Sequence, residues 1–107
     1  MISQNDIQQL IDTIVEKFHP EKVILFGSYA RGTQDDESDI DLVVITSDEK
    51  TDVREQAAAM GTAVWNIPGP KDILVRTRKQ FQEEIAAEWT VFHAAEEEGV
   101  VLFERCG

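Results

Sequence analysis

Cysteine and basic residues are both scarce in this sequence. Cys106 is the only cysteine, so an intramolecular disulfide is impossible and nothing requires an oxidising compartment. Lys and Arg together number 10, against 21 Asp and Glu, which gives a net charge of −11. Because phosphate contacts need clustered cations, we expect no direct binding to duplex nucleic acid or to an anionic membrane. The negative charge suits solubility, attraction of divalent cations or docking on a basic partner, and composition alone does not choose among them.

Long hydrophobic runs are also missing. No stretch approaches the ~18 apolar residues of a membrane span, and the first residues, MISQNDIQQL, lack the basic start and apolar run of a signal peptide. We therefore expect a cytoplasmic protein. The length of 107 residues, without repeats or a long linker, predicts a single domain over residues 1–107.

Apolar spacing and turn signals predict helices that alternate with short strands. A first helix is expected up to Phe18, with Ser3 as its cap and Asp6 three residues later. The other expected helices lie at about 29–31, at 48–60 after a Ser47 cap, and after the capping box of Thr77 and Gln80. Strands are expected at 23–26, 39–45, 72–76 and 100–103, the last of them at an edge. This order predicts a small sheet with helices on at least one face.

Two details of this pattern predict how the fold packs. The apolar half of the strand at 39–45 is continuous, which predicts cover on both of its faces. Trp65 and Trp89 are expected to pack within the fold rather than to stack on a base. In the last helix, one side is expected to carry Phe81, Ile85, Trp89 and Phe92.

Two carboxylates open the second strand and suggest a metal site. Asp39 and Asp41 are one residue apart, and because side chains alternate along a strand, both point the same way. Like charges side by side repel one another, so something must compensate them. Mg²⁺ does so well, because it takes one or two carboxylates together with phosphate oxygens and water. The alternative is an acidic loop end that is simply solvated.

The first strand ends in a pair of residues suited to phosphate. Gly27 lets the backbone approach a ligand closely, and the Ser28 hydroxyl adds a donor at the start of a helical turn. Arg31 either reaches a phosphate or pairs with the acidic loop. If the two strands are neighbours, a phosphate cradle and a metal pair meet, which describes a site for a metal-bound nucleoside triphosphate.

Asp72 stands alone before the apolar part of the third strand. If that strand lies beside the second, Asp72 joins the two other aspartates, where it could complete a metal shell or accept a proton from an attacking hydroxyl. The corresponding chemistry is in-line displacement at the α-phosphorus, with pyrophosphate leaving. The alternative is that Asp72 is simply a solvated residue at the start of the strand. Arg76 and Arg78 are candidates for the mouth of the site or for ordinary surface charges.

The string ILFGSYARGTQDDESDIDLVV, with Gly27-Ser28 followed by Asp39-x-Asp41, resembles the signature of the minimal nucleotidyltransferases of the DNA polymerase beta superfamily. The resemblance extends to the first helix, the Asp-led third strand and the closing segment EEGVVLFE. It implies an α+β fold, with a small mixed, largely antiparallel sheet flanked by helices as in the polymerase beta palm.

The resemblance also implies residue roles. Asp39 and Asp41 would bind Mg²⁺, as two ions, Asp72 would serve as ligand and base, and Gly27 and Ser28 would contact the β- and γ-phosphates of ATP. Small members of this family often accompany a helical HEPN protein, an RNA-cutting toxin that they neutralise by transferring AMP to a tyrosine. The polymerase-like enzymes carry further substrate-binding domains, so a second chain or a second copy of this one would supply that surface here.

Two functions therefore remain open. The first is an active nucleotidyltransferase that moves a nucleoside monophosphate, AMP from ATP, onto a protein hydroxyl. The second is a non-catalytic antitoxin or regulatory module that neutralises a partner by contact, which the small size and large charge also suit. A small-molecule acceptor ranks below both, because it needs a recognition pocket that the sequence does not reveal.

Overall fold

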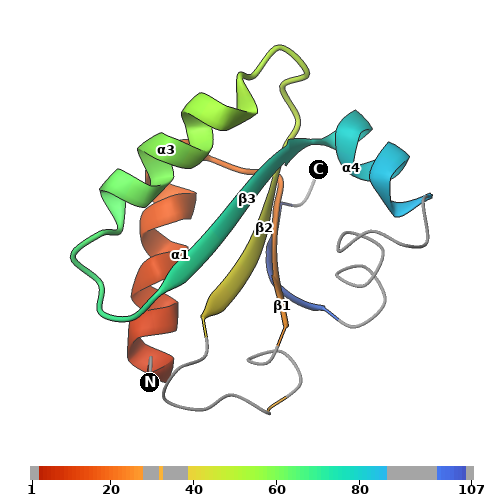
Figure 1. Cartoon of the computed structure of the whole chain (residues 1–107). Helices are drawn as coiled ribbons and strands as arrows, with labels where there is room; N and C mark the ends of the chain where they lie inside the picture. The colour runs from red at the N-terminus through yellow and green to blue at the C-terminus, as the bar shows by residue number, and fades with distance from the viewer. Residues whose placement is uncertain (1–2, 28–31, 33–38, 87–98, 106–107) are drawn as a thin grey trace.

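Helices and strands alternate along most of the chain (Figure 1). The computed structural model describes residues 3–27, 32, 39–86 and 99–105. Within them, the elements are α1 (Gln4–Phe18), β1 (Lys22–Phe26), β2 (Ile40–Thr46), α3 (Val53–Ala63), β3 (Lys71–Thr77), α4 (Arg78–Ile85) and β4 (Val100–Glu104). The expected helix at 29–31 lies outside the described residues, as do Trp89 and Phe92 of the last expected helix.

The four strands form one mixed sheet in the order β3-β2-β1-β4. β1 pairs antiparallel with both β2 and β4, whereas β2 pairs parallel with β3. The sheet is therefore largely antiparallel, and β4 lies at an edge as the sequence predicts. Because β2 and β3 run the same way, the chain must cross over between them, and α3 makes that crossover.

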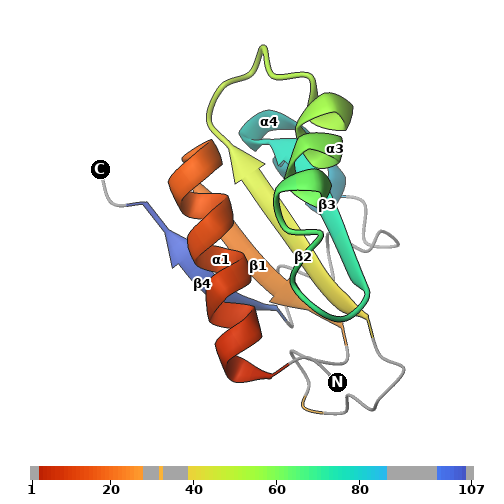
Figure 2. The same ribbon diagram turned by 90° about the vertical axis from the view of Figure 1, so that its left-hand side faces the viewer.

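Helices cover both faces of the sheet. Figure 2 shows α1 and α3 lying across one face, and in Figure 1 α4 lies on the other side. Alternate residues of β2 enter two clusters: Ile40, Leu42 and Val44 join the larger core under α1 and α3, while Val43 and Ile45 pack with Phe81 of α4. The continuous apolar run of β2 is thus buried on both faces, as predicted. No helix among the described residues is long and apolar enough to span a membrane.

Local capping signals set the limits of α1 and α4. The Ser3 hydroxyl accepts from the Asp6 amide while the Asp6 carboxylate accepts from the Ser3 amide, which completes a capping box. Thr77 and Gln80 form the same reciprocal pair at the start of α4. His19 ends α1 in the left-handed region, with φ 49°, and its amide donates to Val15 O. The predicted Ser3 cap and the predicted capping box of Thr77 and Gln80 are both confirmed.

The expected start of the middle helix was wrong. α3 begins at Val53, and its cap is Asp52, whose carboxylate accepts from the amides of Arg54 and Glu55 at 3.2 Å each. The residues just before it form a turn, because the Asp48 carboxylate accepts from the Lys50 amide at 2.9 Å. An aspartate that bonds its own backbone two residues on competes with helix formation, so the helix starts later than the composition suggests.

A second expectation, that Trp65 packs within the fold, was wrong. Its side chain is 80% exposed in the segment between α3 and β3 instead of packing in the fold. Its neighbours Val64 and Ile67 fill the available core positions, at 1% and 3% exposure. The tryptophan is therefore held outward by the residues that flank it.

The cap of α3 gives a test of this local assignment. Replacing Asp52 by Ala should lower the free energy of unfolding by about 1 kcal/mol, because two amide donors at the helix start lose their partner. Ser47→Ala is the matched control, since the Ser47 hydroxyl accepts from Arg105 at the surface and caps no helix. Urea unfolding measures both changes. An equal or larger loss in Ser47→Ala would contradict the assignment.

Candidate active site

Three strand ends meet at one edge of the sheet. β1 ends where β2 begins, so Phe26 is the register partner of Asp41. Across the parallel pair, Asp41 is in turn the register partner of Asp72. The two aspartates therefore lie side by side on neighbouring strands. The starts of β2 and β3 lie at the lower end of the sheet in Figures 1 and 2. The condition that the sequence set for Asp72, a third strand beside the second, is met.

Strand alternation assigns these aspartates to one face. Asp41 alternates with Ile40 and Leu42, whose side chains enter the core under α1 and α3. Asp72 alternates in the same way with Ile73, which also packs against that core. Both carboxylates thus belong to the opposite face, where α4 covers only the other end of the strands. Among the described residues, no helix covers the aspartate end of that face.

Gly27 approaches Asp41 more closely than any other residue type could. Its φ is +77°, and a Cβ built on it would lie 2.3 Å from Asp41 Oδ2. A real Cβ never approaches an oxygen so closely, so a side chain at this position would push the carboxylate away. The sequence predicted Gly27 as a phosphate contact; its contact with Asp41 depends on the antiparallel register and has no signature in the linear spacing.

The remaining predicted site residues are less closely defined. Asp39 precedes β2 by one residue and is exposed, and it shares the alternation of Asp41. Ser28 and Arg31 lie outside the described residues. Within the described ranges, no three His, Cys, Asp or Glu side chains are close enough together to hold a metal ion. The structure therefore brings Asp41 and Asp72 together, and the full ligand set stays a prediction.

The residues present fit a hard cation at this edge. Two carboxylates on adjacent strands supply the oxygen donors that Mg²⁺ prefers, and their mutual repulsion is offset when a cation binds between them. The missing side chain at Gly27 lets Asp41 Oδ2 pack against the end of β1, at the position that a Cβ would otherwise take. The donor chemistry thus agrees with the metal that the sequence predicts.

Residues 7–102 match the nucleotidyltransferase domain family. This chain belongs to that family. The nucleotidyltransferase shares 52% identity over 31 residues with MJ0141 of Methanocaldococcus jannaschii, which is provisionally named a protein adenylyltransferase. That match spans 29% of this chain and 31% of the relative, less than a third of either.

Solved structures show the same fold. A provisionally named nucleotidyltransferase from Sulfolobus solfataricus is similar with a TM-score of 0.65 and 22% identity, over 94% of this chain and 79% of that one. A toxin–antitoxin structure with AMP-PNP gives a TM-score of 0.56 and 25% identity, over 97% of this chain and 75% of that one. These similarities confirm the α+β nucleotidyltransferase fold predicted from the sequence.

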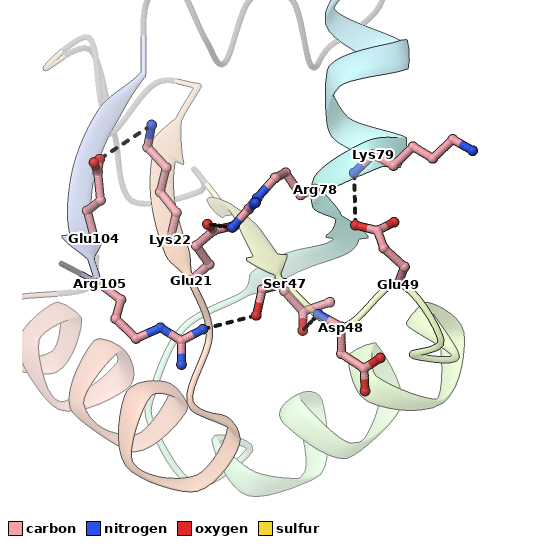
Figure 3. Close-up of polar contacts among 10 residues, drawn as sticks. Glu21, Lys22, Ser47, Asp48, Glu49, Arg78, Lys79, Glu104 and Arg105 are labelled. Atoms are coloured by element: carbon pink, nitrogen blue, oxygen red, sulfur yellow. Dashed lines mark hydrogen bonds and ion pairs between the residues drawn. The ribbon is translucent and has the colours of Figure 1, made fainter. Parts of the chain in front are cut away.

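Arg76 and Arg78 lie far from the aspartates along the sheet. Arg76 Nε contacts Glu84 Oε1 at 3.2 Å, and the Arg78 guanidinium donates to both carboxylate oxygens of Glu21 (Figure 3). Arg76 lies near the C-terminal end of β3 and Arg78 is the first residue of α4, whereas Asp72 is the second residue of β3. Both arginines form ion pairs at the other end of the sheet. They are therefore surface charges, and they do not lie at the mouth of the site.

The ion pair with Arg78 changes the pKa of Glu21. Hydrogen bonds from Arg78 lower the pKa of Glu21, partial burial works against this, and the charges of Arg78, Arg105 and Lys22 lower the pKa further. A carboxyl whose pKa is lower in the folded state stabilises the fold above its unfolded pKa, and that contribution is lost as pH falls through the folded pKa. The Glu21 contribution is therefore complete at neutral pH and fades in acid.

Gly27 provides the sharpest test of the site geometry. Gly27→Ala should destabilise the protein by more than the about 1–2 kcal/mol that a left-handed alanine costs, because its methyl also strikes Asp41. Adding Asp41→Ala should recover the steric part, a coupling of roughly 1 kcal/mol in a double-mutant cycle from urea unfolding. Gly32→Ala is the matched control: its φ is +73°, but its Cβ meets no described residue within 4 Å. Additive effects at Gly27 and Asp41 would reject the contact.

A second prediction concerns the Glu21 pair. Arg78→Gln should raise the pKa of Glu21 toward its usual value, as followed by NMR titration of the carboxyl. The variant should be less stable than the parent at pH 7, and the difference should shrink below about pH 4, where the unfolded carboxyl protonates. Arg76→Gln, which breaks a different pair, should leave the pKa of Glu21 unchanged. A stability difference that persists at low pH would show that Arg78 acts through packing instead.

Proposed function

We propose that this nucleotidyltransferase is a Mg²⁺-dependent enzyme that transfers AMP from ATP to a hydroxyl group on a protein. The observation that carries the proposal is the meeting of Gly27, Asp41 and Asp72 at one edge of the sheet. A carboxylate that packs against the end of β1, with a second carboxylate on the next strand, suits a metal-bound triphosphate. One folded domain over residues 1–107, acting in the cytoplasm, would suffice for this chemistry.

We assign separate chemical roles to the three aspartates. Asp39 and Asp41, together with Asp72, would hold two Mg²⁺ ions. The metal would orient the triphosphate and neutralise the charge that develops on it. Asp72 would accept the proton of the acceptor hydroxyl. The hydroxyl oxygen then forms a bond to the α-phosphorus of ATP, the bond from that phosphorus to the bridging oxygen breaks, and pyrophosphate leaves with the electron pair.

The other predicted residues would bind the phosphates. Gly27 offers close backbone approach at the end of β1, and Ser28 would add its hydroxyl to the β- and γ-phosphates. Arg31 would contribute a positive charge to the same groups. A nucleoside triphosphate held in this way presents its α-phosphorus toward the aspartate pair.

A protein acceptor has support from two directions. The relative MJ0141 carries a protein adenylyltransferase name, and a toxin–antitoxin structure with AMP-PNP shares the fold. The net charge of −11 suits docking on a basic partner. We infer that the acceptor is a helical HEPN-type toxin whose tyrosine receives AMP, and that a second copy of the chain could add further acceptor surface.

The test is transfer of label from ATP. The assay combines ATP labelled in its α-phosphate, Mg²⁺ and the product of the neighbouring gene, which we expect to be a HEPN-type protein, and it should yield labelled partner protein. Asp39→Ala with Asp41→Ala should abolish transfer, and Asp72→Asn should slow it by about 10²–10⁴-fold, the usual contribution of a general base. Asp12→Asn on α1, whose carboxylate accepts from Gln8 at the surface, is the matched control and should leave the rate unchanged.

Two further measurements, of the melting temperature and of toxin suppression, separate catalysis from binding alone. Mg²⁺ with ATP should also raise the melting temperature by mass action, and the double aspartate variant should lose that increase. If the double variant still suppresses the toxin as well as the parent does, the non-catalytic module is the correct function. If the parent transfers no label to the HEPN-type protein, the proposed acceptor is rejected.

A further inference from the structure

The strand β3 is buried towards its C-terminal end and not at its start. Val75 and Thr77 are its buried residues, whereas Lys71 is half-buried and Asp72 is exposed. Hydrophobic burial therefore holds the end of the strand firmly and its start weakly. The repulsion between the carboxylates of Asp72 and Asp41 also tends to separate this start from β2. Another contact has to hold the start of β3 in place.

The segment that leads into β3 is poor in hydrogen-bond donors. Residues 66–70 read Asn-Ile-Pro-Gly-Pro, and a proline has no backbone N–H. Ile67 is buried, at 3% exposure, but the next three residues up to Pro70 are exposed. The turn also contains Gly69 with a φ of +98°. Its own backbone can supply few of the hydrogen bonds that would fix this turn, so a side-chain donor has to supply others.

Lys71 supplies them. It is the first residue of β3, and its ammonium donates to Gly69 O at 2.9 Å and to Ile67 O. These two hydrogen bonds tie the start of the strand to the buried Ile67 across the three exposed residues. Lys71 is the register partner of Ile40, whose side chain enters the core under α1 and α3, so its side chain and the Asp72 carboxylate belong to opposite faces. Lys71 therefore supports the strand from behind the site.

The turn that Lys71 holds is joined directly to β2. Pro70 O accepts from the Ile40 amide at 3.0 Å, at the lower end of the sheet where the starts of β2 and β3 lie in Figures 1 and 2. Ile40 directly precedes Asp41, and Pro70 lies two residues before Asp72. Because burial already fixes β2, this hydrogen bond sets the position of the β3 start for as long as Pro70 keeps its place.

We propose that Lys71 is a positioning residue of the candidate site, whose ammonium fixes the turn at 67–70 and thereby keeps Asp72 beside Asp41. This inference rests on the proposed function, since it assigns a role at the same metal site. Mg²⁺ demands near-ideal ligand geometry, so a displaced carboxylate weakens its binding. Residues that orient the ligands of a metal typically contribute 10–100-fold to its affinity, by about the same logic as here.

The direction of the effect separates positioning from charge. Lys71 is a cation next to Asp72 in the chain, and by Coulomb's law alone its removal would strengthen the binding of another cation nearby. Loss of positioning weakens that binding instead. A role confined to the stability of the fold would lower the melting temperature without changing the Mg²⁺ concentration at which the site is half saturated.

Lys71→Met tests this, because it keeps the aliphatic stem and removes the ammonium. The melting temperature is followed as Mg²⁺ is added in the presence of ATP, without an acceptor protein. The half-saturating Mg²⁺ concentration should rise at least about tenfold. Lys71→Arg, which keeps donors for both carbonyls, should restore most of the affinity. Lys22→Met is the matched control: it removes the same charge from the first residue of β1, where Lys22 pairs with Glu104 at 3.5 Å, and should not weaken Mg²⁺ binding.

Hydrogen exchange tests the same contact without any metal. The Ile40 amide, which donates to Pro70 O, should lose protection in Lys71→Met. The Val44 amide, further along β2, should keep its protection. Lys22→Met should change neither amide. Equal losses at Ile40 and Val44 would show that the substitution loosens the whole sheet and would reject a local role.

The outcomes distinguish this inference from the function on which it rests. Unchanged or tighter Mg²⁺ binding in Lys71→Met would overturn the positioning role while the proposed function stands. Unchanged protection of the Ile40 amide would also overturn it, since the turn would then hold without the ammonium. If Mg²⁺ with ATP does not stabilise the parent, the proposed function fails, and hydrogen exchange decides: a selective loss at Ile40 supports the hold of Lys71 on the strand start, and no loss rejects it.

Discussion

The two opposite pairings of β2 determine where the site can form. Because β1 runs antiparallel to β2 and β3 runs parallel to it, the end of β1 and the starts of β2 and β3 lie at one edge of the sheet. A purely antiparallel sheet would place the start of β3 at the opposite edge, and Asp72 could not be the register partner of Asp41. The crossover through α3 is thus the structural requirement for the aspartate pair.

Holding two carboxylates side by side is unfavourable without a cation, so the rest of β2 must compensate for it. Ile40, Leu42, Val43, Val44 and Ile45 are all buried, and they anchor the strand on both faces of the sheet. Their burial fixes the register, since a shift by one residue would carry every apolar side chain of β2 to the wrong face. The same hydrophobic packing that stabilises the fold therefore keeps Asp41 beside Asp72 in the absence of metal.

Features that depend on a few adjacent residues could be predicted from the sequence. The caps at Ser3 and Thr77 are local, and both were predicted correctly. The cap of α3 was misplaced because Ser47 and Asp52 both suit a helix start, and only the turn around Asp48 decides between them. Trp65 was expected to pack because residue type favours burial, but its neighbours had already filled the core. Strand register has no local signal at all, so the aspartate pairing had to be stated as a condition on the position of the third strand.

The edge position of β3 determines how exposed Asp72 is. An inner strand is flanked on both sides, so a residue on it meets ligands only above or below the sheet. Asp72 lies on an edge strand and is accessible both from the face that it shares with Asp41 and from the outer side that borders α3. Under the proposed function, the Asp72 carboxylate would therefore be the group of the aspartate pair that an acceptor hydroxyl reaches most directly.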